Sequence, residues 1–288
     1  MSAATPPLPH PLISVEQLHD DMTGEISPVL LDVRWTLTGA QPDAYRQAHI
    51  PGAVFCDLDA DLSDHSIEPD SGGRHPLPTA DSFTATMRRL GVSPDRSVVV
   101  YDAKDSTAAA RAWWVLTYFG HRDVRVLDGG LRAWVSAGRE VTSGDESPTH
   151  PGTFTAQPGH LSTVTTEQVV DADSLRLLDA RAAERFRGDI EPMDPIPGHI
   201  PGAVNTPTAD LVDAEGRFLP ASALREKFAE LGVTPADPLP VVAYCGSGVT
   251  ACHTILALRL IDIPAALYPG SYSLWCRLPG AKIARGPH

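Results

Sequence analysis

Cysteine, positive charge and long apolar runs are all scarce in this sequence. Four cysteines occur in 288 residues. They form neither a Cys-x-x-Cys pair nor a regular Cys/His spacing, so the sequence predicts no disulfide framework and no zinc site. No apolar run approaches the roughly 20 residues of a membrane-spanning helix. Residues 1–11 lack the basic and apolar regions of a signal peptide. We therefore expect a cytoplasmic protein with reduced thiols, which needs no metal or organic cofactor.

The shortage of basic residues also restricts the possible partners. The formal net charge is −13 at pH 7, which argues against nucleic acid and anionic membranes as partners. A small anionic ligand would need a local positive field in its binding site. The content of apolar residues (42%) and of charged residues (20%) is ordinary for a globular chain that buries a core.

The two halves of the chain repeat each other in the same order. The string His-Ile-Pro-Gly-Ala-Val stands at 49–54 and recurs unchanged at 199–204. Further segments match in pairs: 14–17 with 165–168, 30–34 with 177–181, 90–94 with 231–235, 98–101 with 241–244, and 127–130 with 268–271. This repeat predicts a duplicated domain.

Each half alternates β-branched runs with helical patterns. In the second half, 175–180 and 240–244 are typical of buried strands, and 222–231 and 250–260 of helices. The alternation predicts an α/β fold of two tandem domains, each with a mostly parallel central sheet flanked by helices. We expect the domains to span 1–145 and 161–288. The stretch 146–160 between them has the Ser, Thr, Gly and Pro content of a linker.

One cysteine stands at the position where such a fold binds ligands. Cys245 follows the strand pattern 240–244 directly, at the end of the strand where parallel sheets bind ligands. The residues Gly-Ser-Gly-Val-Thr-Ala follow at 246–251 and lead into a helix. Backbone N–H groups of a tight loop and a helix N-terminus both favour an anion, so we expect a reactive thiolate. A cysteine phosphatase would need arginine where Ala251 stands, which argues against phosphate hydrolysis.

These motifs resemble the two-domain rhodanese family, the thiosulfate and 3-mercaptopyruvate sulfurtransferases. The likeness spans about 13–275, and the loop 245–251 is similar to the mercaptopyruvate type. The resemblance implies that a small anionic donor passes a sulfane sulfur to Cys245. An acceptor such as cyanide, thioredoxin or another thiol then removes it from the persulfide. It also implies a non-catalytic first domain, in which Asp102 occupies the place of the cysteine.

The resemblance assigns further site residues. It implies a relay in which Asp59 holds His75, and His75 polarises Ser247. Arg185 would grip the anionic group of the donor. The remaining residues implied to bind the substrate are Gly246, Gly248, Val249 and Thr250.

One departure leaves the donor open. The mercaptopyruvate type carries a second arginine before the string Gly-His-Ile-Pro-Gly, but 191–197 contains none. Arg74 and Arg187 are the candidates to replace it. The alternatives are a thiosulfate-preferring enzyme on the same scaffold and a carrier that holds a persulfide only for a dedicated partner. Outside the site, we interpret Cys252 as a core residue and His253 as a residue of a helix surface.

Overall fold

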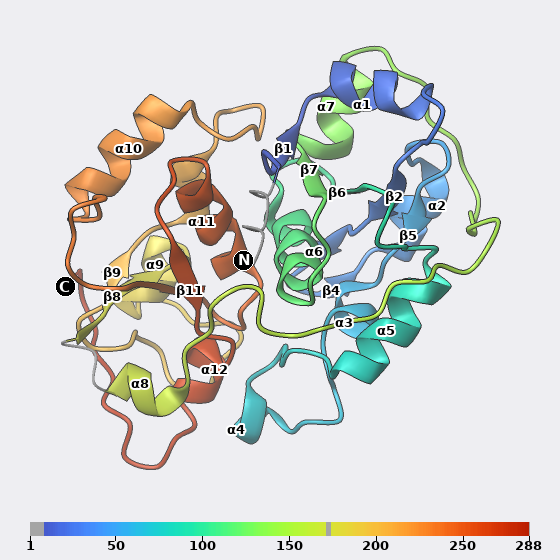
Figure 1. The fold of residues 1–288 in the computed structure, drawn as a ribbon. Helices are drawn as coiled ribbons and strands as arrows, with labels where there is room; N and C mark the ends of the chain where they lie inside the picture. The colour runs from blue at the N-terminus through green and yellow to red at the C-terminus, as the bar shows by residue number, and fades with distance from the viewer. Residues whose placement is uncertain (1–8, 171–173, 288) are drawn as a thin grey trace, which may run out of the picture.

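The computed structural model describes residues 9–170 and 174–287 and shows two α/β domains side by side (Figure 1). Most of the segment 1–11, for which the sequence predicts no signal peptide, lies outside the described residues. Among the residues that are described, no helix has both the length and the apolar character to cross a bilayer.

The first domain is built on a five-stranded parallel sheet with the order β1-β7-β6-β2-β5. Its strands are β1 (Leu12–Ile13), β2 (Val29–Asp32), β5 (Val54–Phe55), β6 (Val98–Tyr101) and β7 (Val124–Leu127). Its helices are α1 (Val15–Met22), α2 (Pro42–Gln47), α3 (Leu58–Asp61), α4 (Pro69–Gly72), α5 (Ala80–Arg89), α6 (Thr107–Tyr118) and α7 (Gly130–Ser136). A small antiparallel pair, β3 (Trp35–Thr36) and β4 (Gly39–Ala40), lies beside the sheet.

The second domain repeats this plan with a four-stranded parallel sheet, in the order β11-β10-β8-β9. Its strands are β8 (Arg176–Asp179), β9 (Val204–Asn205), β10 (Val241–Tyr244) and β11 (Ala265–Leu267). Its helices are α8 (Thr166–Val170), α9 (Ala183–Arg187), the 3-10 helix η2 (Thr208–Leu211), α10 (Ala221–Glu230), α11 (Thr250–Arg259) and α12 (Ser271–Trp275). The strands β7-β6-β2-β5 therefore match β11-β10-β8-β9 in order, which confirms the α/β prediction for both halves.

The matched sequence pairs form matched local structures. Ser14 and Gln17 make a capping box at the start of α1. Thr165 and Gln168 exchange the same two hydrogen bonds before α8, at 2.8 and 3.4 Å. A hydroxyl and an amide thus satisfy N–H groups that the first turn of a helix leaves unpaired. The repeat in the sequence therefore predicts local structure as well as topology.

The segment 146–160 contains no helix or strand and packs on the first domain. The N–H of Phe154 donates to the carbonyl of Val92 at 3.1 Å, and that of Gly152 to Arg88 at 2.7 Å. The ring of Phe154 and the side chain of Ala156 are buried. The boundaries at 145 and 161 remain predictions, and the connection between them is held against one domain.

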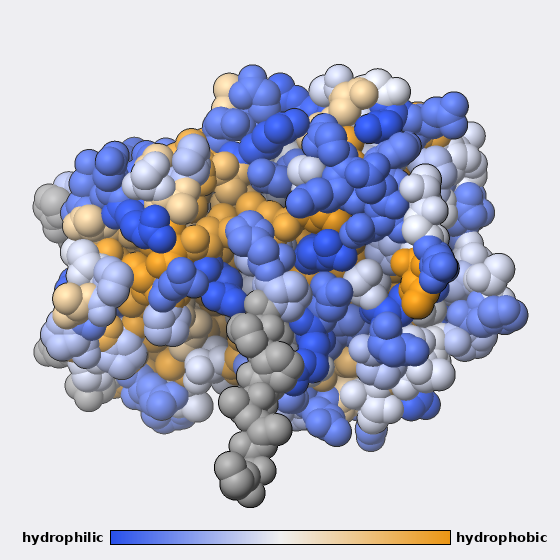
Figure 2. Space-filling model, turned by 45° about the horizontal axis from the view of Figure 1, so that its top comes forward, coloured by the Kyte–Doolittle hydropathy of each residue, from blue (hydrophilic) through white to orange (hydrophobic). Residues whose placement is uncertain are grey.

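The two domains meet through α6 and α11, and one hydrophobic cluster includes residues from both (Figure 1). Trp114 on α6 and Leu256 on α11 are fully buried in this cluster. Figure 2 shows a face of the molecule where a band of apolar side chains crosses between hydrophilic regions. Because α6 and α11 each follow a central strand, their packing brings the loops before both helices to one place.

Candidate active site between the domains

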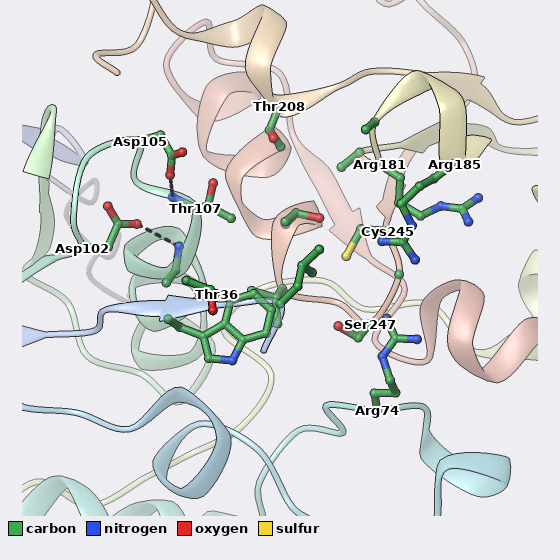
Figure 3. A pocket seen from close by; sticks show the side chains of 18 of the residues that line it. Thr36, Arg74, Asp102, Asp105, Thr107, Arg181, Arg185, Thr208, Cys245 and Ser247 are labelled. Carbon is green, nitrogen blue, oxygen red and sulfur yellow. Dashed lines mark hydrogen bonds between the residues drawn. The ribbon is translucent and has the colours of Figure 1, made fainter. Parts of the chain in front are cut away.

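A cavity of about 360 Å³ lies where the loops before α6 and α11 face each other (Figure 3). Cys245 lines it from the second domain, and Asp102 lines it from the first. The pair β3–β4 adds Trp35 and Thr36 to the wall. The Cys245 residue is 1% exposed, so its sulfur is reached through this cavity rather than from the outer surface.

The loop after β10 turns back on the sulfur. The N–H of Gly248 donates to Cys245 Sγ at 3.1 Å. Gly248 has a φ of +82°, and a Cβ there would lie 2.8 Å from the carbonyl oxygen of Pro269. Only glycine meets both demands without strain. The N–H of Cys245 itself donates to Ser271 Oγ at 3.2 Å. The shape of the loop therefore requires glycine at position 248.

Three of the four predicted loop contacts line the cavity. Gly246, Val249 and Thr250 form part of its wall. Gly248 stands behind the loop, where its N–H reaches the sulfur and its carbonyl accepts from Arg111 Nη1 at 3.2 Å. The residues that the structure describes hold no cluster of three or more His, Cys, Asp or Glu side chains able to bind a metal.

The corresponding loop of the first domain is filled by its own carboxylate. Asp102 is buried and occupies the position of the cysteine at the end of β6. Burial, assisted by the nearby Asp105, raises the pKa of Asp102 to about 6. Four backbone N–H groups donate to its two oxygens, from Lys104, Ser106, Ala108 and Ala109, at 2.9–3.2 Å. This strand–loop–helix unit therefore directs four backbone N–H groups at one carboxylate.

The three predicted relay residues line one cavity of about 320 Å³, which adjoins the cysteine loop. His75 Nε2 lies 2.9 Å from Asp59 Oδ1, and the indole N–H of Trp35 donates to the same oxygen at 3.0 Å. His75 Nδ1 is buried and has no hydrogen-bond partner. The structure therefore contains the aspartate–histidine pair, and it brings Ser247 to the same cavity without a serine–histidine hydrogen bond.

The environment keeps this histidine neutral. Burial lowers the pKa of His75, and the hydrogen bond to Asp59 only partly opposes the effect. Burial alone would raise the pKa of Asp59, but hydrogen bonds from His75, Trp35 and the backbone of Ala40 lower it overall. An ionised carboxylate only accepts hydrogen bonds, so Nε2 must carry the imidazole proton. The unpartnered Nδ1 is then a base, free to accept a proton.

Arg185 lies at the cavity and is already paired with carboxylates. Its Nη2 is 2.6 Å from Glu191 Oε1, and its Nε is 3.2 Å from Oε2. Asp194 Oδ2 lies 3.4 Å from the same Nη2. Burial alone would raise the pKa of Glu191, but its bonds to Arg185 hold it below the usual value. Arg185 therefore lines the same cavity as Cys245, with part of its charge balanced by the protein.

The two candidate replacements for the missing arginine differ in position. Arg74 lines both cavities and pairs with the buried Asp194. Arg187 pairs with Asp189 at 2.7 Å on the surface and lines neither cavity. The structure therefore places Arg74, and not Arg187, at the site.

Sequence reasoning missed Arg111, a fully buried arginine on α6. Its Nη1 donates to the carbonyl of Gly248, and its Nη2 donates to those of Leu62 and His75 at 3.1 Å. One guanidinium of the first domain thus holds the cysteine loop and the histidine loop together. The signal in the sequence was an arginine inside the apolar helical pattern 108–116.

Two residues follow the loop 245–251 at the start of α11, and both are buried. Cys252 is fully buried, and burial raises the pKa of its thiol to about 12, which fits a core residue. The surface placement of His253 is wrong. Its side chain is 1% exposed and stacks on Phe218, with 4.4 Å between the ring centroids. The helix α11 lies between two domains, so its polar side chains can face a protein neighbour rather than solvent.

Fold and site together define a class of protein. Two copies of one α/β unit enclose a cavity, and only the second copy presents a cysteine at the end of its central strand. The model of the rhodanese-like domain family matches residues 14–137 and 164–278. This chain therefore belongs to the rhodanese family of sulfurtransferases.

Individual relatives agree with this assignment. A protein of Mycobacterium tuberculosis named putative thiosulfate sulfurtransferase SseB is 46% identical, over 89% of this chain and 90% of its own length. A probable 3-mercaptopyruvate sulfurtransferase of Pseudomonas aeruginosa is 43% identical, over 96% and 98%. The crystal structure of SseA from Escherichia coli, described as a 3-mercaptopyruvate sulfotransferase, superposes with a TM-score of 0.79. It is 33% identical and covers 91% of this chain and 98% of its own.

Proposed function

We propose that this sulfurtransferase moves a sulfane sulfur from 3-mercaptopyruvate or thiosulfate, through a persulfide on Cys245, to a thiol or cyanide. One observation carries the proposal: of the four cysteines, Cys245 is the one that lines the cavity between the domains. Burial raises the pKa of the other three thiols, Cys56, Cys252 and Cys276, so they stay protonated.

The transfer proceeds in two half-reactions. The Cys245 thiolate attacks the outer sulfur of the donor, and a new S–S bond forms on the enzyme. With thiosulfate, the S–S bond of the donor breaks and sulfite leaves with the electron pair. With 3-mercaptopyruvate, the C–S bond breaks and the enolate of pyruvate leaves. An acceptor thiolate or cyanide then attacks the outer sulfur of the persulfide and regenerates the Cys245 thiolate.

The relay serves the mercaptopyruvate reaction. The enolate of pyruvate must gain a proton, whereas sulfite leaves without needing one. The thiol of the donor brings this proton. The proton passes through the Ser247 hydroxyl to the free Nδ1 of His75, once the donor has drawn the two residues together, and returns by the same path to the enolate. Asp59 fixes the imidazole with Nε2 protonated. Hydrogen bonds of this kind commonly tighten only in the substrate complex.

Both donors carry an anionic group that suits the cationic part of the site. Arg185 faces the cavity beside Gly246, the residue after the nucleophile, so its guanidinium can hold a carboxylate or a sulfonate. The named relatives include both enzyme types. The proposed relay through Ser247 favours 3-mercaptopyruvate. Thiosulfate remains the second candidate because 191–197 contributes no arginine.

Paired kinetics test the proposal. We expect turnover with both donors, and a higher kcat/KM for 3-mercaptopyruvate than for thiosulfate. The reverse ratio would establish the thiosulfate-preferring alternative. The carrier alternative is tested separately, by adding dithiothreitol or cyanide to donor-treated protein and following its intact mass. A carrier would keep the added sulfur atom, whereas the enzyme returns to its starting mass.

A further inference from the structure

We propose that Arg74, from the first domain, binds the anionic group of the donor together with Arg185 from the second. This inference rests on the proposed function and names a residue of the same site. Arg74 takes the place of the second arginine that 191–197 lacks, so residues of both domains form the donor site.

Asp194 holds the two arginines together. Its side chain is fully buried. One oxygen pairs with Arg74 Nη1, and the other lies 3.4 Å from Arg185 Nη2. Arg277 Nη1 also approaches this carboxylate, at 3.3 Å. Asp194 thus stands in the segment expected to carry an arginine, and it positions an arginine that comes from the other domain.

The two guanidiniums leave free donors that converge beside the nucleophile. The Nη2 of Arg74 and the Nη1 of Arg185 have no hydrogen-bond partner among the described residues. A Cβ on Gly246 would lie 2.7 Å from Arg74 Nη2 and 3.4 Å from Arg185 Nη1. Both nitrogens therefore lie close to one point in the wall, one residue after Cys245. Figure 3 shows Arg74 and Arg185 approaching the cysteine loop from opposite sides.

Arg74 is held in place by the second domain. Its backbone N–H donates to Ser273 Oγ on α12 at 3.0 Å. The preceding residue, Gly73, has a φ of +80°, and a Cβ there would lie 2.5 Å from the carbonyl oxygen of Gly270. Arg277 Nε lies 3.3 Å from Asp70 on α4, and α4 packs against α12. The loop that carries Arg74 is therefore docked on the second domain before any donor arrives.

The chemistry of this pair selects the ligand class. A carboxylate or sulfonate has at least two oxygens and can accept from one N–H of each arginine. With a formal net charge of −13, the rest of the chain repels such an anion, so the local pair must attract it. 3-Mercaptopyruvate carries a carboxylate and thiosulfate a sulfonate, so Arg74 serves either donor.

Arg74→Met is the test, with Arg187→Met as its matched control. We expect Arg74→Met to raise the donor KM about 10- to 100-fold with either donor, because a charge-assisted hydrogen bond to the anion is lost. Arg187→Met should leave KM unchanged. Arg74→Lys keeps the charge but loses the fork, so its KM should fall between those of the wild type and Arg74→Met.

Separating the half-reactions distinguishes donor binding from a loss of structure. At low donor concentration, Arg74→Met should gain the persulfide sulfur slowly, and a saturating donor should restore loading. Once loaded and freed of donor, the variant should release its sulfur to dithiothreitol at the wild-type rate. Equal slowing of loading and release, or a KM within twofold of the wild-type value, would overturn the role of Arg74.

A binding measurement is independent of turnover. Cys245→Ser cannot take up the sulfur, so calorimetric titration with thiosulfate reports anion binding alone. Adding Arg74→Met should weaken this binding about 10- to 100-fold. Equal affinities in the two proteins would remove Arg74 from the site. If wild-type protein took no sulfur from either donor while this difference persisted, the proposed function would fail and the anion site would stand.

Discussion

The two loops that follow the central strands β6 and β10 have the same position and different contents. In the first domain, Asp102 places its carboxylate inside the loop, where four backbone N–H groups donate to it. In the second, Cys245 Sγ accepts one N–H, that of Gly248. Each loop leads into a buried helix, α6 or α11, at the domain interface.

The difference shows what this loop is built to do. Four N–H groups converge on one carboxylate, so the loop offers hydrogen bonds to an anion, which partly offset the burial that raises the pKa of Asp102 to about 6. The loop of the first domain is filled by its own carboxylate, so it leaves these N–H groups no place for an anion from outside. The second presents a sulfur, so the negative charge can be that of a thiolate, a persulfide or an approaching donor. One scaffold thereby gives a structural anion site and a reactive one.

Removing the nucleophile has the largest expected effect on this comparison. Cys245→Ser should abolish turnover with both donors, because the hydroxyl cannot form a persulfide. Cys252→Ala, seven residues along the chain, is the matched control. It should keep most of the activity, because burial holds the pKa of the Cys252 thiol at about 12. Steady-state assays with both donors check this, and residual turnover in Cys245→Ser would refute the assignment.

Emptying the first loop should cost stability. Asp102→Ala leaves four N–H groups without their acceptor, so we expect the free energy of unfolding to fall by about 3 kcal/mol or more. Denaturant unfolding measures the loss, and added sulfate should recover part of it. Asp105→Ala is the control, because the side chain of Asp105 is 38% exposed. An unchanged stability in Asp102→Ala would mean that the carboxylate does not hold the loop.

Replacing the serine tests the chemistry that only the second loop supports. Ser247→Ala should lower kcat/KM for 3-mercaptopyruvate about 10²-fold, the usual contribution of a general acid. The loss with thiosulfate should be small, because sulfite needs no proton to leave. The ratio of the two kcat/KM values is the measurement. Equal losses with both donors would show that Ser247 shapes the loop instead of protonating the enolate.

The histidine on α11 gives the smallest predicted effect. Burial lowers the pKa of His253 to about 4, against about 6.5 in an unfolded chain. Between these values the unfolded chain binds the proton more readily, so stability is lost as the pH falls through this range. Ala110 occupies the corresponding place on α6.

Replacing this histidine should reduce the sensitivity to acid. His253→Phe should lose about 1–2 kcal/mol less stability than the wild type between pH 6.5 and 5. Unfolding free energies of both proteins across that range are the measurement. Parallel curves would show that His253 does not titrate in this way.

Local patterns allowed the fold and the position of Cys245 at the end of a central strand to be predicted from the sequence. Neighbouring residues determine the strand 241–244, the glycine at 248 and the helix from 250. Because the chain is duplicated, the strand and the helix could be recognised in both halves. The resemblance also placed Asp59 and His75, which the structure brings to one cavity although they come from the other domain.

Contacts made by domain docking could not be predicted in the same way. The salt bridge of Arg74 with Asp194 joins residues 120 positions apart, and the bond from Arg111 to Gly248 spans 137. Periodic patterns in a local stretch of sequence carry no information on contacts between residues so far apart in the chain. The wrong placement of His253 also reflects a contact that is distant in the sequence, because its ring stacks on Phe218.

The central claim is that a single sulfur atom is carried by Cys245. The most direct measurement is peptide mass analysis of the protein after incubation with 3-mercaptopyruvate or thiosulfate, followed by removal of the donor. The account predicts one additional sulfur on the peptide that contains Cys245 and its loss on adding dithiothreitol. A sulfur found on Cys56, Cys252 or Cys276, or on no peptide with either donor, would contradict it.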